Sequence, residues 1–268
     1  MLKKFLMAFG MLVVAGSAAA EDITNPFYLP FQGQFGSVTS ASIEKFILKN
    51  DAAYVKSHKI LAQEDIQFGL TDTLSFTAGI GNIWDWWKGT PKIFLDGLAG
   101  RTMRDSENIF WNAGLAWDAL SGPTRLQFAA QYGQNRWKNF DGEYKYVSGE
   151  ARFGYQFKRV LPYITGAVEV PLWQKSGTKG IAGDKLIYNT KLGLYQGKCE
   201  TWALDTGVRL KYDENAESRL ISAEAEASYY LTPKASLGVY GTYALDGYSK
   251  YDLDVHDKSA GVRLRLYF

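Results

Sequence analysis

The sequence is poor in the residues that build metal sites and many catalytic centres. Its 268 residues include one cysteine, Cys199, and two histidines. A lone cysteine excludes an internal disulfide, and no spaced set of cysteine and histidine residues is present to bind zinc. The motifs G-x-S-x-G and H-E-x-x-H do not occur either. From these absences we expect no cofactor and no bound metal.

The sequence also lacks a long hydrophobic run and an excess of either charge. No segment has roughly 18 consecutive apolar residues, so we expect no transmembrane helix. When Lys3 and Lys4 are left out, because they belong to a signal peptide described below, the chain holds 28 basic and 28 acidic residues. This balance predicts no nucleic-acid partner. Aromatic residues make up 15% of the chain, and this abundance argues against disorder.

The first residues, MLKKFLMAFGMLVVAGSAAAED, have the layout of a secretory signal peptide. Two lysines precede a short apolar stretch, and Ala18 and Ala20 form an Ala-x-Ala cleavage site. The apolar stretch is too short to cross a bilayer as a helix. We expect residues 1–20 to be removed and residues 21–268 to form a single domain.

Most of the remaining chain alternates between apolar and polar residues, which is the pattern of β-strands. Segment 200–212, ETWALDTGVRLKY, shows it best, with Trp202 and Tyr212 at the two ends of its apolar face. The roughly ten steps between these rings span about 25 Å of height in a tilted strand, which matches the apolar band of a membrane barrel. We therefore predict that the apolar face meets lipid and that the charged face points inward.

Short turns and longer links alternate along the chain and divide it into twelve such segments. The predicted strands are 33–48, 58–70, 74–84, 108–119, 124–136, 144–157, 161–173, 185–195, 201–212, 218–231, 235–246 and 254–268. Short turns at one end and longer loops at the other are typical of membrane-spanning barrels. The predicted fold class is all-β, a closed antiparallel transmembrane β-barrel of about 12 strands in meander order, with both termini on the periplasmic side.

The chain ends in GVRLRLYF, residues 261–268, which is apolar on one face and carries two arginines on the other. With the signal peptide, the alternating strands and FGLTDTLSF at the first turn, this ending resembles Gram-negative outer-membrane β-barrel (porin-like) proteins. The resemblance implies location in the cell outer membrane. It implies as partners outer-membrane lipid, lipopolysaccharide, periplasmic chaperones and the barrel-assembly machinery. In that class the machinery recognises a last strand ending in Phe, and the matching positions are Val262, Leu264, Tyr267 and Phe268.

The strand register directs charged side chains of both signs into the barrel. The predicted lumen residues are Glu150, Arg152, Lys191, Arg209, Lys211, Glu224, Glu226, Arg263 and Arg265. Our leading hypothesis is an outer-membrane channel for passive diffusion of small hydrophilic or charged solutes, in which these side chains set selectivity. The alternatives are a structural barrel plugged by its own ion pairs and a barrel that binds ligands at its surface.

A second alternative is an outer-membrane hydrolase with a site at the rim. In YDLDVHD, residues 251–257, Asp252, Asp254 and His256 share one face. A similar Asp-x-His pair activates water in surface proteases of the omptin class. Asp85 could supply the other half of such a site, but no second aspartate lies two residues away. Polarity of a solvated loop explains these residues equally well, and we favour a protein that is not an enzyme.

A cluster of tryptophans at residues 81–89 has two open interpretations. In GNIWDWWKG, residues 81–89, the three tryptophans Trp84, Trp86 and Trp87 are either interface anchors or, beside Lys88 and Lys92, a platform for lipopolysaccharide.

Glu64 conflicts with the predicted register. Counted from Leu70, strict alternation points its carboxyl group toward lipid, where a charge is costly. Either a β-bulge turns Glu64 inward or the strand boundary differs from the predicted one.

Replacing Arg263 and Arg265 together by serine removes two positive charges from the predicted lumen. We expect ion selectivity to shift toward cations, measured as the reversal potential in planar bilayers under a salt gradient. An unchanged reversal potential would show that these arginines do not act as the filter. A barrel that inserts but never conducts would favour the plugged alternative.

Overall fold

A computed structural model describes residues 22–50, 53–89, 106–138, 142–176, 179–181, 185–198, 201–214, 217–249 and 253–268. The predicted signal peptide, residues 1–20, lies outside the described residues, and so do residues 90–105 between the strands predicted at 74–84 and 108–119. None of the described residues forms a helix long and apolar enough to cross a membrane.

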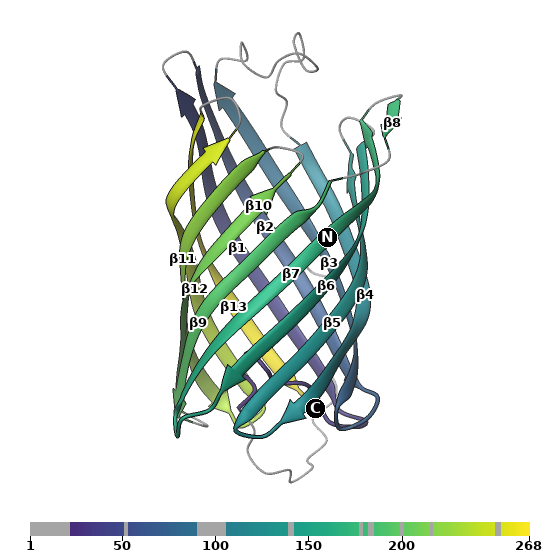
Figure 1. The fold of residues 1–268 in the computed structure, drawn as a ribbon, viewed down its shortest axis with the longest axis vertical. Coiled ribbons are helices and arrows are strands. Elements are labelled where there is room, and N and C mark those ends of the chain that lie inside the picture. Colours follow the sequence, from purple (N-terminus) through teal and green to yellow (C-terminus); the bar gives the residue numbers. More distant parts are fainter. Residues whose placement is uncertain are drawn as a thin grey trace.

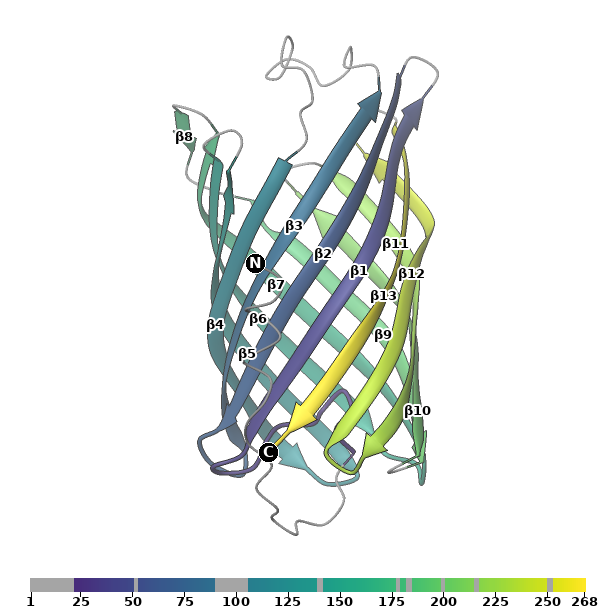
Figure 2. The same cartoon turned by 180° about the vertical axis from the view of Figure 1, so that it is seen from behind.

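The described residues form one antiparallel sheet that closes on itself (Figures 1 and 2). Its strands are β1 (Phe35–Asn50), β2 (Ala53–Gly69), β3 (Leu74–Gly89), β4 (Ser106–Ser121), β5 (Thr124–Trp137), β6 (Gly142–Tyr155), β7 (Val160–Ser176), β8 (Lys179–Ile181), β9 (Ile187–Lys198), β10 (Trp202–Asp213), β11 (Ser218–Thr232), β12 (Ala235–Ser249) and β13 (Leu253–Tyr267). Successive strands pair with one another except at β8, which pairs only with the end of β7, so that β7 pairs with β9. β1 pairs with β13 and closes the sheet. The predicted barrel of twelve strands in meander order is therefore confirmed.

The strands are longer than the sequence pattern indicates. β2 and β7 have 17 residues each, and the pairing of β1 with β2 extends as far as Asn50 and Ala53. The strands predicted at 33–48 and 58–70 therefore left too long a connection between them. Backbone hydrogen bonding continues above the apolar band, where water replaces lipid and the alternation of side chains is no longer required.

The apolar side chains of the wall point outward. Ile43, Leu192 and Val239 are 63%, 62% and 61% exposed, although the same residues in a soluble protein would fill the core. Serine, glutamine and tyrosine side chains are buried on the inner face instead. This orientation agrees with the prediction that lipid covers the outside and that polar groups face the lumen.

The seam between β1 and β13 is fixed at its edge by close contacts. Phe35 and Phe268 exchange two backbone hydrogen bonds of 3.2 and 2.8 Å. Next to them, Gly36 lies opposite Tyr267, and a Cβ atom at Gly36 would meet the tyrosine ring at 2.4 Å. The absence of a side chain at Gly36 therefore lets Tyr267 lie flat inside the barrel.

Glu64 lies on the outer face, because the pairing of β1 with β2 contains no bulge. It is opposite Thr39 on one side and the exposed Ile80 on the other. The hydroxyls of Ser37 and Thr39 both donate hydrogen bonds to its carboxylate, the second at 2.5 Å. Two neighbouring hydroxyls thus replace water for a carboxylate that keeps strict register.

This arrangement predicts that the hydroxyls of Ser37 and Thr39 contribute more to the stability of the barrel than the Glu64 carboxylate does. Replacing Ser37 by alanine and Thr39 by valine leaves Glu64 without donors and should lower the free energy of unfolding by about 1–3 kcal/mol. Adding Glu64→Leu to that variant should restore most of the loss. Denaturant unfolding in lipid vesicles measures both. A double variant as stable as the parent would contradict this account.

Candidate functional site

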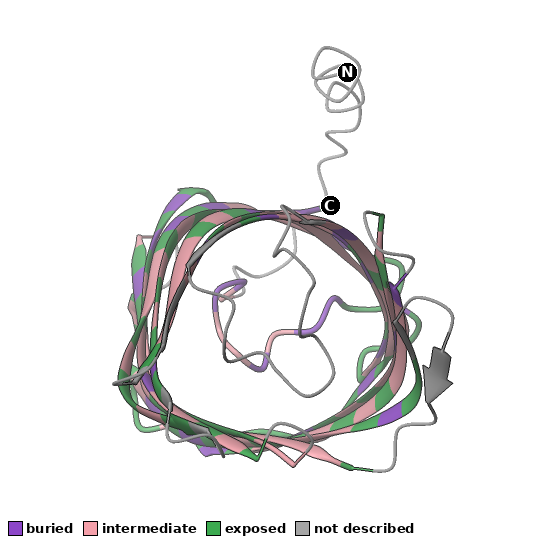
Figure 3. Cartoon of the chain, turned by 90° about the horizontal axis from the view of Figure 1, so that it is seen from above, coloured by how far each residue is buried: buried purple, intermediate pink, exposed green. Residues whose placement is uncertain are grey.

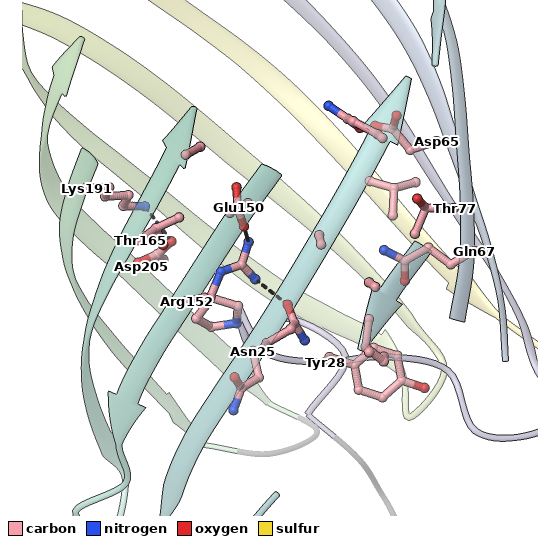
Figure 4. A pocket seen from close by; sticks show the side chains of 18 of the residues that line it. Asn25, Tyr28, Asp65, Gln67, Thr77, Glu150, Arg152, Thr165, Lys191 and Asp205 are labelled. Atoms are coloured by element: carbon pink, nitrogen blue, oxygen red, sulfur yellow. Dashed lines mark hydrogen bonds and ion pairs between the residues drawn. The ribbon is translucent and has the colours of Figure 1, made fainter. Parts of the chain in front are cut away.

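The lumen contains a cavity of about 720 Å³ near the end of the barrel that holds residues 22–34 and Tyr267. Strands β1 to β7, β9 to β11 and β13 supply its wall, and residues 22–34, here called the N-terminal segment, form one end of it. Seen from above, the described part of this segment lies inside the ring of strands (Figure 3). Figure 4 shows Asn25 and Tyr28 of the segment facing wall residues across this space.

Local turns bend the N-terminal segment into the lumen. The backbone N–H of Asn25 donates to the Asp22 carbonyl at 2.9 Å, and that of Tyr28 donates to the Asn25 carbonyl at 2.9 Å. The Asn25 side chain also accepts from the Phe27 N–H at 2.9 Å, a local bond typical of asparagine in turns. At the exit, the Gly33 N–H donates to the Gly69 carbonyl at 2.8 Å and joins the segment to the end of β2.

Polar contacts hold the beginning of the segment against the wall. The hydroxyls of Tyr195 and Tyr230 both donate to the Asp22 carboxylate, the first at 2.5 Å. The Thr24 hydroxyl lies 2.7 Å from the Tyr195 hydroxyl and 3.1 Å from that of Tyr230. Two wall tyrosines therefore satisfy a carboxylate that enters the lumen.

Phe27 supplies the apolar contact of the segment. Its ring is 2% exposed and belongs to a cluster with Leu161, Tyr163, Tyr195 and Ala203. Burying a phenylalanine side chain is worth about 1.5–3 kcal/mol. Because the wall of this barrel is apolar on its outside, this small cluster and a second one around Tyr267 are the described apolar cores of the molecule.

Strands β9, β10 and β11 carry one network of ion pairs. Lys191 lies 2.9 Å from the Asp205 carboxylate and 3.6 Å from that of Glu224. Arg209 donates two hydrogen bonds to Glu224, one of them 3.0 Å long. The Tyr163 hydroxyl donates to Asp205 at 2.8 Å. The register places Lys191 directly opposite Arg209, and the two carboxylates offset the repulsion between these cations.

A second network joins β11 to β13 across β12. The Glu226 carboxylate accepts hydrogen bonds from Arg263 and is 2.5 Å from Nη1 of Arg265. Gly238 of β12 lies between them, where a Cβ atom would be 2.8 Å from Oε1 of Glu226. The missing side chain at Gly238 leaves the space in which the arginines reach the glutamate. Arg263 also lies over the Tyr240 ring, 4.6 Å from its centre.

The opposite wall is mostly uncharged. Arg152 pairs with Glu150 at 2.5 Å and donates to Gln127 at 3.2 Å, as Figure 4 shows for the ion pair. Beyond them the wall presents amides and hydroxyls from Gln63, Gln67, Thr77, Asn112 and Gln131. The cavity thus has one side with two networks of ion pairs and an opposite side in which amides and hydroxyls outnumber charged groups.

Comparison with known proteins gives the fold a context. No protein-family model matches the chain, and no curated protein matches it in sequence. Among solved structures, the COG4313 outer-membrane channel from Pseudomonas putida F1 is similar, with 13% identity, 92% of this chain and 100% of that chain covered, and a TM-score of 0.64. The chain has the fold of a Gram-negative outer-membrane β-barrel.

Two further barrels show the same likeness. The translocator domain of the autotransporter NalP from Neisseria meningitidis has 13% identity over 85% of this chain and 87% of that chain, with a TM-score of 0.54. The CymD monoaromatic hydrocarbon channel has 12% identity over 89% of each chain, with a TM-score of 0.50. At these identities the likeness establishes the fold and leaves the solute open.

The structure brings the predicted lumen residues together. Those that line the cavity are Glu150, Arg152, Lys191, Arg209, Lys211, Glu226, Arg263 and Arg265. Glu224 belongs to the network beside them. Lys211 forms no ion pair with any described residue. The inward orientation is observed, whereas a role of these residues in selectivity stays a prediction.

Sequence reasoning missed two parts of the cavity. Asp65 of β2 points inward, where Gln63 donates to its carboxylate at 2.7 Å. It was missed because the conflict at Glu64 left the predicted register of this strand open. The N-terminal segment was also missed, because a short stretch rich in turn residues carries no periodicity. Its one signal is Phe27, an apolar residue outside any predicted strand.

The predicted assembly signal is divided between the two faces of β13. Val262 and Leu264 alternate on the outer face, and Phe268 is exposed at the rim. Tyr267 is buried inside the barrel, with the Tyr28 ring at right angles to it and 4.7 Å away. Recognition of these residues by the assembly machinery stays a prediction.

The two halves of the predicted hydrolase site do not converge. Asp254 and His256 lie on the outer face of β13 and are exposed. Asp85 is buried on the inner face, where the Ser57 hydroxyl donates to its carboxylate. Asp252 lies outside the described residues. The barrel wall separates Asp85 from His256, so this pairing was wrong.

In the described part of the chain, no group of three or more His, Cys, Asp and Glu side chains is placed to hold a metal ion. Trp84 and Trp86 lie on the outer face of β3, as an interface anchor requires, whereas Lys92 lies outside the described residues.

The contacts of Asp22 predict how firmly the segment is held. In a Cys199→Ser background, Ile23→Cys is a buried reporter thiol. Adding Tyr195→Phe and Tyr230→Phe removes the donors to Asp22, so labelling by a water-soluble maleimide should become about tenfold faster or more. Tyr240→Phe, a lumen tyrosine away from the segment, is the control. Equal labelling rates in all three would show that these hydroxyls do not hold the segment.

Proposed function

We propose that the protein is an outer-membrane channel that admits small polar or charged solutes to its lumen. The observation that carries the proposal is the cavity of about 720 Å³, whose wall is built from ionised, amide and hydroxyl groups. This volume is within the usual range of small-molecule sites. Two of the three similar barrels described above are channels by name, which supports a transport role.

The chemistry of the wall favours hydrated solutes. A solute that enters must exchange part of its hydration shell for wall groups, and paired ions offer both a donor and an acceptor at short range. The unpaired Lys211 adds a positive charge above the two networks. We infer that small anions and neutral polar molecules pass more readily than cations of equal size.

The N-terminal segment sets the size limit in this proposal. Ile23, Tyr28 and Leu29 form one end of the cavity, so the free cross-section is smaller there than in the open barrel. In this proposal the barrel is oriented in the outer membrane with both chain ends in the periplasm and the longer link after β3 on the cell surface. Insertion would then use the predicted terminal signal ending at Phe268.

A second candidate is a channel for small apolar molecules. Similarity to a barrel named as a monoaromatic hydrocarbon channel favours it, together with the apolar side chains of Ile23 and Leu29 at the end of the cavity. Against it, a hydrocarbon would have to pass between ion pairs that lose hydration without any replacement.

The experiment compares two neighbouring alanines of β5. Ala129 lines the cavity, whereas Ala130 is exposed on the outer face. In liposomes, Ala129→Trp should lower the influx of a small sugar or amino acid by about tenfold, because the indole fills much of the free lumen. Ala130→Trp should leave the influx unchanged.

The same liposomes distinguish the two candidate functions. Toluene entry that depends on the protein and falls in Ala129→Trp, with no flux of sugars, amino acids or salts, would replace the polar proposal by the apolar one. Absence of any flux with correctly folded protein would overturn both.

A further inference from the structure

The outer face of β1 and its neighbours carries a row of basic residues. Lys45 of β1 lies directly opposite Lys258 of β13 and directly opposite His58 of β2. These three positions share the outer face with the strongly exposed Ile43. Lys56 follows on the same face of β2, one row further along.

The lysines in this row lack the carboxylates that accompany other cations of the barrel. Residues directly opposite in a sheet have Cβ atoms about 4.5–5.5 Å apart, and like charges there repel. Yet Lys45, Lys56 and Lys258 form no ion pair with any described residue. The neighbouring carboxylate, Asp254, is opposite Lys49 instead.

Some other outward cations of the barrel are paired with carboxylates. Lys138 lies 2.8 Å from Glu107, and Arg219 lies 2.7 Å from Asp246. Inside the lumen, the similar juxtaposition of Lys191 and Arg209 is offset by two carboxylates. Among the described residues, no carboxylate offsets the positive charge of the row around Lys45.

The height of the row points to a membrane interface. Lys45 follows the rim residue Phe35 by ten positions in β1, which corresponds to about 25 Å along the barrel axis. Trp86 lies in the same row, opposite His58, and Trp84 lies below it, opposite Ile60. Tryptophan at this depth marks the boundary between acyl chains and headgroups.

We propose that Lys45, Lys258 and Lys56, beside His58, bind the phosphate groups of a phosphorylated glycolipid, the lipopolysaccharide of the outer leaflet. Several phosphates fixed on one compact sugar headgroup match cations held about 5 Å apart on rigid strands. Ile43, Ile60 and Trp84 lie below and would contact the acyl chains. A phospholipid carries one phosphate and matches this spacing less well.

Native mass spectrometry of the barrel in neutral detergent tests the proposal with purified lipid A as the probe. Lys45→Gln with Lys258→Gln should weaken binding of lipid A by about 30-fold, since each lysine near an anionic headgroup contributes about fivefold. Lys45→Arg with Lys258→Arg should retain binding. Lys138→Gln removes one partner of an existing ion pair on the same face and should leave the affinity within about twofold.

Two further probes identify the source of the phosphate. Lipid A without its phosphates should bind far more weakly, and phosphatidylglycerol should bind more weakly than lipid A. Equal binding of either probe, or unchanged binding by the double glutamine variant, would overturn the proposal. So would equal weakening in Lys138→Gln. Heat-dependent gel mobility confirms that each variant is folded, and none of these measurements depends on what passes through the lumen.

Discussion

The pairing of β1 with β13 is the contact on which the rest of the molecule depends. Lipid offers no hydrogen-bond partner to a backbone, so an open sheet edge cannot exist at membrane depth. Closing the seam removes both edges at once and creates the inside of the barrel. Only after closure do Arg263 and Arg265 of the last strand face an enclosed lumen, where they pair with Glu226.

Polar groups are arranged by the same constraint on both faces of the wall. Inside, cations and carboxylates from three adjacent strands satisfy one another, which keeps the lumen wet without leaving large unbalanced charge. Outside, Glu64 obtains two hydroxyl donors, while the lysines around Lys45 form no ion pair within the described part of the chain. The two outward sites differ in height, since Glu64 lies within the apolar band and Lys45 at its edge.

Much of this architecture can be predicted from the sequence, and the features that cannot be predicted have a common cause. Alternation predicts the twelve strands and which face of segment 200–212 is charged, because a one-residue slip would put every charge in lipid. It cannot predict partners such as Glu226 with Arg263, which reach across a strand over Gly238. Nor can it predict the N-terminal segment, whose place depends on contacts with residues about 130–200 positions away in sequence.

The tight fit at Gly36 has a consequence for register. A slip of the seam by two residues would keep every side chain on its own face, so the in–out pattern alone does not forbid it. Such a slip would place Tyr267 opposite Val38 or Gln34 and would carry it away from Tyr28. The N-terminal segment therefore favours the native register of the seam, because Tyr28 contacts Tyr267 only when β1 and β13 pair in that register.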